Sequence, residues 1–291
     1  MITFIEFARA NGVLIDPSKF CPSEKIKRCG TVEKPRSLNG AFFWNGERGW
    51  VQDWSGDARV IWFGEHRPFT EQEKRDWAAK RALAASDQDR AYERASQQAD
   101  TLLRACKLEN HPYLEYKGFK DIRGLVFEGK LIIPMRNVRT NKLQGYQSIA
   151  WDEETRKYGK KMLYGMQARN AVLWLGSKGE ETWLVEGFAT GLSVRHALKS
   201  VGIPASVVVT FSASNMVAVA DQIPGKRYVF ADNDESKTGE KAAADTGLPW
   251  TMADQVGWDA NDLHLEKGLF QLVGKIMELR CKKSVDIPDT V

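Results

Sequence analysis

The sequence predicts an α/β fold with a central parallel sheet, and three observations in its second half predict it. Short apolar runs alternate with helical stretches there, in the order that builds parallel strands. The runs at 182–185, 205–211 and 227–231 are rich in β-branched and aromatic residues, as buried strands are. Acidic residues follow directly after two of these runs, at the edge of such sheets where ligands bind.

Helical stretches would cover both faces of this sheet. The pattern predicts them over 188–199, 214–222, 240–246 and 262–280. His196 and His264 fall on these helices, and we interpret them as packed or surface residues rather than as ligands.

Carboxylates end two of the predicted strands. Glu186 follows the run at 182–185, and Asp232 and Asp234 follow the run at 227–231. Alternate residues of an extended chain point the same way, so Asp232 and Asp234 can face one point. Three buried carboxylates stay charged together only when cations accompany them. The sequence therefore predicts a site for Mg²⁺ or Mn²⁺, which bind hard oxygen ligands.

These residues resemble a known family. Leu184-Val185-Glu186-Gly187, Ala231-Asp232-Asn233-Asp234 and Gly257-Trp258-Asp259-Ala260-Asn261-Asp262 look like the three acidic motifs of the Toprim domain, found in bacterial-type primases, topoisomerases and some nucleases. Their order and spacing are similar to those of primases from phages, plasmids and prophages. The resemblance implies catalytic roles for Glu186, Asp232 and Asp234, and metal ligation by these three with Asp259 and Asp262.

Two alternatives remain at these motifs. All the acids could be unrelated solvated loop residues, and Asp262 could be a plain helix N-cap. The chain also departs from the family at Thr190, where many primases carry an aspartate.

Positive charge gathers just before the acidic strands. Five basic residues lie within fourteen positions, at Arg156, Lys157, Lys160, Lys161 and Arg169. The family places nucleotide and template contacts in this preceding half. We expect Lys160 and Lys161, with Arg136 and Gly187, to bind nucleotide, and Arg156 and Lys157 to bind template DNA. A solvated basic loop is the alternative. Between His111 and Ile149, apolar runs separated by Gly and Asn predict strands.

The N-terminal part is rich in aromatic residues. A short helix is expected over 3–11, and hairpins with Gly turns follow. Trp44, Trp50, Trp54 and Arg48 would form a stacking surface for single-stranded DNA, or the rings would simply be the core of a small domain. The segment resembles the zinc ribbon of Toprim primases in position but lacks four metal ligands. Cys21, Cys29 and His66 leave a degenerate zinc site conceivable, with free thiols the alternative.

The chain is expected to have four parts. A small β module spans 1–66, a long connecting helix 67–107, a mixed α+β N-terminal half of a primase core 108–175, and a Toprim domain 176–291. The net charge of +4 is too small to prove a nucleic-acid partner by itself. The sequence has no signal peptide pattern and no long apolar run, so a cytoplasmic protein without a membrane partner is expected.

The resemblance implies a primase, which makes short primers from nucleoside triphosphates on single-stranded DNA during replication of a mobile element. The alternatives are a strand-cleaving Toprim nuclease and a non-catalytic protein that binds single strands. No Walker A motif is present, so a helicase partner would be a separate protein.

Overall fold

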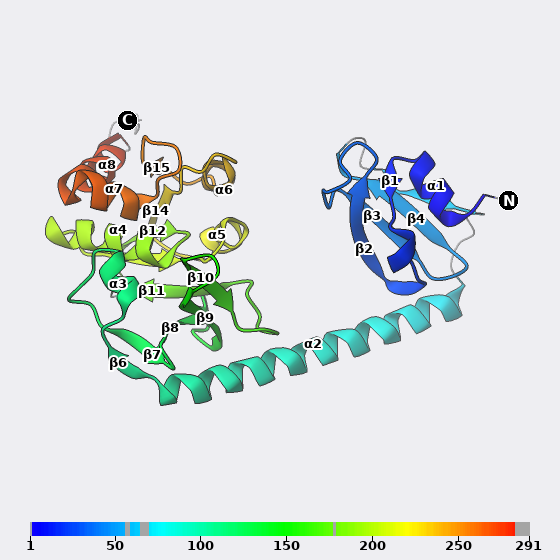
Figure 1. Ribbon diagram of the computed structural model, residues 1–291, viewed down its shortest axis with the longest axis horizontal. Helices are drawn as coiled ribbons and strands as arrows, with labels where there is room; N and C mark the ends of the chain where they lie inside the picture. The colour runs from blue at the N-terminus through cyan, green and yellow to red at the C-terminus, as the bar shows by residue number, and fades with distance from the viewer. Residues whose placement is uncertain (1, 56–58, 65–69, 177–178, 283–291) are drawn as a thin grey trace, which may run out of the picture. The chain divides into compact units, whose positions relative to one another are not determined.

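The computed structural model describes residues 2–55, 59–64, 70–176 and 179–282. The chain forms two compact units, Met1–Arg81 and Ala82–Val291, each described here by itself. The boundary lies within the long helix α2 (Glu71–Ala105), and the first residues of the range 67–107 expected for a connecting helix lie outside the described residues (Figure 1).

The first unit is an antiparallel sheet covered by a short helix. Its strands pair in sequence order, β1 to β5. Thr3 and Glu6 form a capping box at the start of the helix, which ends at Asn11 before Gly12. The elements are α1 (Phe4–Ala10), β1 (Val13–Leu14), the 3-10 turn η1 (Pro17–Lys19), β2 (Ser23–Thr31), β3 (Gly40–Trp44), β4 (Gly49–Asp53) and β5 (Ile61–Phe63).

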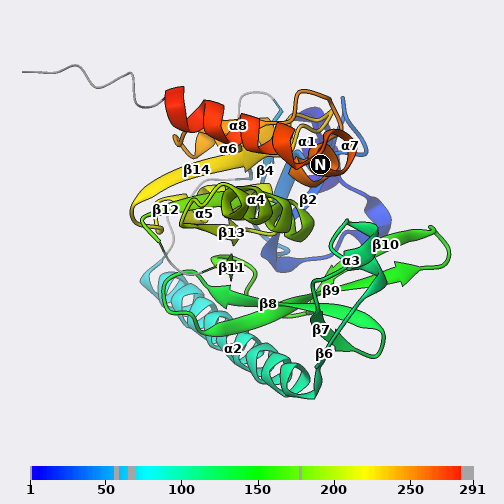
Figure 2. The same cartoon turned by 90° about the vertical axis from the view of Figure 1, so that its left-hand side faces the viewer.

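The second unit is built on one mixed sheet of ten strands. The order is β10-β9-β8-β11-β13-β12-β14-β15, with β7 pairing β8 and β6 pairing β7. Figure 2 shows the strands following one another from β14 down to β8. The strands are β6 (Lys107–Glu109), β7 (Gly124–Phe127), β8 (Lys130–Asn137), β9 (Leu143–Asp152), β10 (Lys157–Met162), β11 (Ala171–Leu175), β12 (Glu181–Val185), β13 (Ala205–Val209), β14 (Lys226–Ala231) and β15 (Trp250–Met252).

Four neighbouring strands of this sheet are parallel. β12 lies between β13 and β14 and is parallel to both, and β15 is parallel to β14. β11 is antiparallel to β13 and to β8, so the parallel strands continue directly into the antiparallel ones. The expected parallel sheet is thus one part of a larger mixed sheet.

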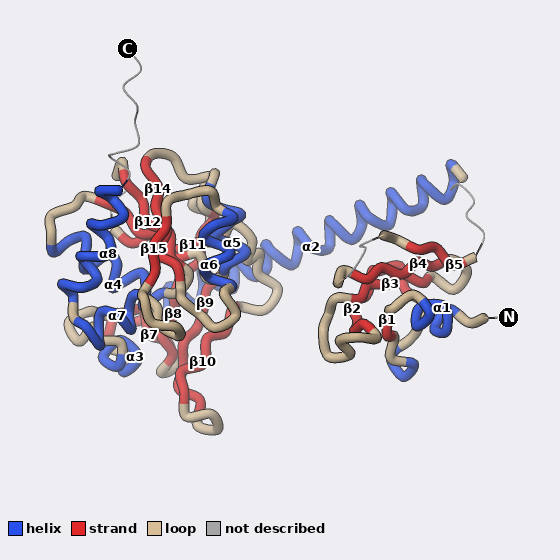
Figure 3. The backbone as a smooth tube through the Cα atoms, turned by 90° about the horizontal axis from the view of Figure 1, so that it is seen from above, coloured by secondary structure: helices blue, strands red, loops and turns tan. Residues whose placement is uncertain are grey.

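Helices cover both faces of the parallel strands (Figure 3). Side chains from α4, α7 and α8 pack in one buried cluster, and side chains from α5 and α6 pack in the other. The helices are α3 (Pro112–Tyr116), α4 (Phe188–Ser200), α5 (Ala213–Ala220), α6 (Thr238–Asp245), α7 (Ala260–Lys267) and α8 (Leu269–Lys282).

Two sequence expectations were wrong. The single helix expected over 262–280 is interrupted at Gly268, whose φ of 85° ends α7 before α8 begins. The run after His111 is the helix α3 rather than a strand, because Pro112 occupies its first turn and the His111 ring accepts a hydrogen bond from the Tyr113 amide.

Candidate active site

The ends of β12 and β14 bring two acidic residues to one edge of the sheet. The strands are adjacent and parallel, so Glu186 and Asp232 leave the sheet on the same side. Gly187 caps the N-terminus of α4, and a Cβ there would lie 3.0 Å from the Thr190 hydroxyl oxygen. A small residue at 187 thus lets the chain turn from Glu186 directly into the helix.

Backbone hydrogen bonds tie the third acidic segment to the second. The Asn233 amide donates to the Trp258 carbonyl at 3.1 Å, and the Gly257 amide donates to the Asn233 carbonyl. The Asn233 side chain also donates to the Ala253 carbonyl at 2.9 Å. This bridge brings Asp259, which follows Trp258, toward Asp232.

Asp232 is the most perturbed of these acids. Burial, followed by the charges of Asp259 and Glu186, raises the pKa of its carboxyl to about 8 against the opposing charge of Lys160. Its Oδ1 atom is buried without a hydrogen-bond partner among the described residues. An acid in this state is held neutral at pH 7 unless a positive charge arrives.

The pKa of Glu186 is also raised, as that of Asp232 is. Burial raises the pKa of its carboxyl, Asp234 adds to the effect, and Lys160 opposes it. The charge of Lys160 therefore lowers the pKa of both Glu186 and Asp232.

Asp234 is held by the start of α6. Its carboxylate accepts hydrogen bonds from the Gly239 amide at 2.9 Å and the Thr238 amide at 3.1 Å, and the Ser236 hydroxyl also donates to it. The Ser236 and Gly239 hydrogen bonds hold the pKa of this carboxyl below its usual value. Asp234 therefore stays ionised while Asp232 does not.

The third acidic motif forms the N-terminus of α7. Asp259 is the N-cap, and its Oδ1 accepts from the amides of Asn261 and Asp262. Asp262 is the third helical residue of the capping box, rather than the N-cap that the sequence left open, and it pairs with Lys117 at 3.8 Å. The Asp259 Oδ2 accepts from the buried Thr190 hydroxyl at 2.9 Å, so the residue that departs from the family pattern is tied to an acid of the site.

The donor set fits a hard divalent cation. Asp232 supplies a buried oxygen without a partner, and Glu186 and Asp259 are its charged neighbours. No three Asp, Glu, His or Cys side chains of the described chain already form a ligand group. Mg²⁺ commonly uses only one or two carboxylates and takes its other ligands from water and substrate phosphates, so the fit does not need three.

Three members of the basic cluster, Lys157, Lys160 and Lys161, lie on a strand rather than in the loop of the alternative interpretation. Lys157–Met162 is β10, paired antiparallel with β9, and Arg156 lies in the turn before it with a φ of 51°. Adjacent residues of a strand point to opposite faces. Accordingly, the charge of Lys160 lowers the pKa of Glu186 and of Asp232, whereas the charge of Lys161 lowers the pKa of Asp152. The structure separates the two lysines that the sequence grouped together.

Gly187, an expected nucleotide contact, directly follows Glu186, whereas Arg136, Arg156 and Lys157 belong to the antiparallel strands β8 to β10 and their turns. The Arg136 guanidinium donates to the Asn141 carbonyl at 3.3 Å, across the turn between β8 and β9. Arg156 and Lys157 are exposed and lie at the turn between β9 and β10.

The first unit divides its aromatic residues between the two faces of its sheet. The Trp44 ring stacks on Phe4 at 4.7 Å and meets Phe63 edge-on at 5.7 Å, so it belongs to the core beneath α1. Trp50 lies beside Trp62 in the next strand and stacks on Phe43 on the opposite face. Trp44 is thus placed apart from the other expected stacking residues, and Arg48 lies at the turn between β3 and β4.

Trp54 is the most exposed of the expected aromatic contacts. Its side chain is 53% exposed, and the Arg28 guanidinium carbon lies 5.3 Å from its ring centre. An aromatic face beside an arginine is the combination that stacks on a base and pairs with its phosphate.

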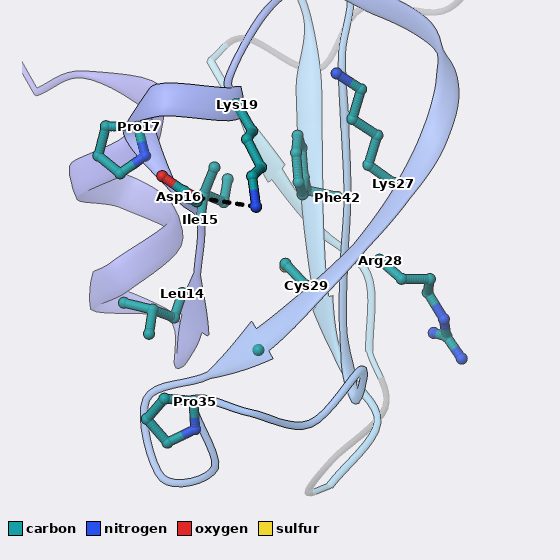
Figure 4. A pocket seen from close by; sticks show the side chains of 11 residues that line it. Leu14, Ile15, Asp16, Pro17, Lys19, Lys27, Arg28, Cys29, Pro35 and Phe42 are labelled. Carbon is teal, nitrogen blue, oxygen red and sulfur yellow. Dashed lines mark ion pairs between the residues drawn. The ribbon is translucent and has the colours of Figure 1, made fainter. Parts of the chain in front are cut away.

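Cys29 is a half-buried free thiol. Figure 4 shows Cys29 as the sole cysteine among the labelled residues of a pocket of about 720 Å³. Burial raises the pKa of the Cys29 thiol to about 11. The Cys21 sulfur lies 3.2 Å from the Lys27 ammonium, and His66 is outside the described residues.

Sequence reasoning missed Tyr113 as a neighbour of the site. It is 1% exposed, its hydroxyl has no hydrogen-bond partner among the described residues, and burial with the charges of Asp259 and Asp262 raises its pKa. The sequence carries no signal for this position, because α3 is far from the acidic motifs along the chain.

The comparisons with known proteins found little at the sequence level. No protein-family model matches the chain, and no curated protein matches it significantly. A solved structure described as the DnaG catalytic core is similar, at 13% sequence identity with a TM-score of 0.38, over 67% of this chain and 72% of that one. No helix in the described parts of the chain is long and apolar enough to cross a membrane.

Proposed function

We propose that this protein is a Toprim-type primase, which joins nucleoside triphosphates into a short primer on a single-stranded DNA template. The observation that carries the proposal is the buried Asp232 carboxyl with its unpartnered oxygen, flanked by Glu186 and Asp259 at the carboxyl edge of parallel strands. The sequence motifs at these positions resemble those of Toprim primases, including the phage and plasmid type.

The chemistry would be attack of a 3′-hydroxyl on the α-phosphorus of a triphosphate, with pyrophosphate leaving. A bound Mg²⁺ or Mn²⁺, held by Asp232 with Asp234, Glu186 or Asp259, would supply positive charge to the phosphates and favour ionisation of the hydroxyl. Lys160 adds positive charge from β10 and would balance the triphosphate. Glu186, whose pKa burial raises toward neutrality, would accept the proton of the attacking hydroxyl.

The division of roles among the acids follows from their surroundings. Asp234 is kept ionised by donors at the start of α6, so it offers a fixed negative charge. Asp232 would stay protonated until a cation binds beside it, and its carboxyl would then ionise. Two carboxylates with opposite pKa shifts at one edge are typical of an active site rather than of solvated loop acids.

The strand-cleaving alternative needs a nucleophilic tyrosine for a covalent link. Tyr113 is the tyrosine whose pKa is raised by Asp259 and Asp262, and it is buried and therefore unable to reach a phosphodiester. This observation favours polymerisation over covalent cleavage by the tyrosine nearest the acids.

The test is incubation of the full chain with labelled nucleoside triphosphates, single-stranded DNA and Mg²⁺ or Mn²⁺. Short products that require template and triphosphate support a primase. Shortened or nicked template instead supports the nuclease, and binding of the strand without either product supports the non-catalytic alternative.

A further inference from the structure

The second unit contains a basic pocket that is separate from the acidic edge. Its volume is about 420 Å³, within the range of small-ligand sites. One wall is the segment 118–122 that follows α3, and the other is α4. We call it the basic pocket.

Three cations line the basic pocket from two segments of the chain. Lys120 comes from the segment after α3, and Arg195 and Lys199 come from α4, where they lie one turn apart with His196 beside them. Asp121 is the one acid among the lining residues. In the described chain, no ion pair or side-chain hydrogen bond engages Lys120, Arg195 or Lys199. Three unpaired cations around one hollow favour a bound anion.

The floor of the basic pocket is apolar. Phe119 and Leu192 are each 5% exposed and belong to the main core, so the floor is rigidly packed. Cations above an apolar floor suit a sugar-phosphate, because the phosphate pairs with the charges while the sugar contacts the floor.

Both walls of the basic pocket lead to the acidic edge. α4 begins two residues after Glu186, and the other wall follows Lys117, whose ammonium is 3.8 Å from Asp262 and whose carbonyl accepts from the Asn261 side chain. Arg195 and Lys199 lie roughly 12 to 18 Å along α4 from its start. A strand of a few nucleotides at the acidic edge would span this distance.

We propose that the basic pocket binds a backbone phosphate of the nucleic-acid strand that occupies the active site. The proposal rests on the proposed function for the identity of the strand. The pocket would hold the strand a few nucleotides from the reacting end, so it would contribute affinity without contacting the reacting atoms.

The test compares two triple variants that lose the same number of charges. One is Lys120→Ala, Arg195→Ala, Lys199→Ala, and the matched control is Arg94→Ala, Lys107→Ala, Lys130→Ala on exposed positions elsewhere in this unit. Fluorescence anisotropy measures the affinity of each full-length protein for a labelled oligothymidylate of about 20 nucleotides over a series of NaCl concentrations. A charge-preserving variant, Lys120→Arg, Arg195→Lys, Lys199→Arg, controls for folding.

The pocket variant should bind roughly tenfold more weakly, and its slope of log affinity against log salt should shrink by about 0.7, the value for one lost phosphate contact with a single strand. The control and the charge-preserving variant should keep the slope of the unmodified protein. An unchanged slope in the pocket variant, or an equal loss in the control, overturns the proposal. Displacement of the oligonucleotide by free ATP that depends on these three residues also overturns it, because the ligand is then a free nucleotide.

The primer assay separates this proposal from the proposed function. If the protein makes template-dependent primers but the pocket variant keeps the salt slope, the proposed phosphate contact is wrong and the primase assignment stands. If the salt slope is reduced in the pocket variant but the unmodified protein makes no primer, the phosphate contact stands and the primase assignment is wrong.

Discussion

The Thr190 hydroxyl donates to the Asp259 carboxylate at 2.9 Å, and it thereby joins the first turn of α4 to the start of α7. Thr190 is fully buried, and Asp259 already accepts two amides at its other oxygen. The contact therefore fixes the carboxylate that lies beside Asp232. The position that departs from the family's acidic pattern supports an acid rather than supplying one.

Thr190→Val should remove this hydrogen bond while keeping the shape of the side chain. The free energy of unfolding, measured with urea, should fall by about 1 to 2 kcal/mol, because the half-buried Asp259 oxygen loses its donor. Thr190→Ser is the matched control and should retain most of the stability. Equal stability of the valine variant and the unmodified protein would show that the contact is unimportant.

Lys160 and Lys161 are adjacent residues on opposite faces of β10 and so serve as each other's control. Lys160→Ala should raise the KM for triphosphate or lower kcat by about tenfold or more, since it removes charge near Glu186 and Asp232. Lys161→Ala should leave both parameters within about twofold. Steady-state primer synthesis measures the difference, and equal effects of the two substitutions would contradict the assignment.

The aromatic residues of the first unit should separate into stacking and core roles. Trp54→Ala should weaken single-strand binding by about 1 kcal/mol or more without changing the melting temperature, because the ring is exposed beside Arg28. Trp44→Ala should instead lower stability by about 3 kcal/mol, because the ring packs on Phe4. Anisotropy and thermal melting test both statements, and a Trp54 variant that binds as tightly as the unmodified protein would refute the stacking role.

The raised pKa of Asp232 makes the metal-free protein lose stability as pH rises. The pKa of this carboxyl is about 8 in the folded protein, against an ordinary value of 3.8, so the folded state binds the extra proton between these limits. The stability is therefore fully present below about pH 4 and falls by at most about 1.4 kcal/mol per pH unit up to about pH 8.

Melting curves in EDTA at pH 5 and pH 7 measure this effect, and the slope should become shallower in Asp232→Asn. Asp245→Asn, at an exposed position on α6, is the control and should keep it. A pH dependence that Asp232→Asn leaves intact would contradict the burial of an unpaired acid.

The order of strands and helices at the acidic motifs was predictable, because buried parallel strands are continuous β-branched runs and carboxyl ends of neighbouring strands meet at one edge. The expected run at 205–211 and the strand Ala205–Val209 differ only at the end, where Thr210 and Phe211 leave the sheet. The break at Gly268 was not predicted, since a single glycine inside an apolar periodic run reads as part of a helix.

Contacts between distant segments could not be predicted from the sequence. The Asn233 bridge to Trp258 and the effect of the Asp259 and Asp262 charges on the pKa of Tyr113 depend on segments far apart in the chain. The opposite faces of Lys160 and Lys161 depend on both residues lying in the strand β10. A basic cluster signals charge but not direction, and direction appears only when the strand and its register are known.

The central claim is that the buried Asp232 carboxyl serves metal-dependent primer synthesis. The most direct measurement is template-dependent primer synthesis with Mg²⁺ or Mn²⁺ by the unmodified protein, Asp232→Asn and the exposed control Asp245→Asn. The account predicts primers from the unmodified protein and the control, and a loss of at least about a hundredfold in Asp232→Asn with the fold intact. Primers at the unmodified rate from Asp232→Asn would contradict it.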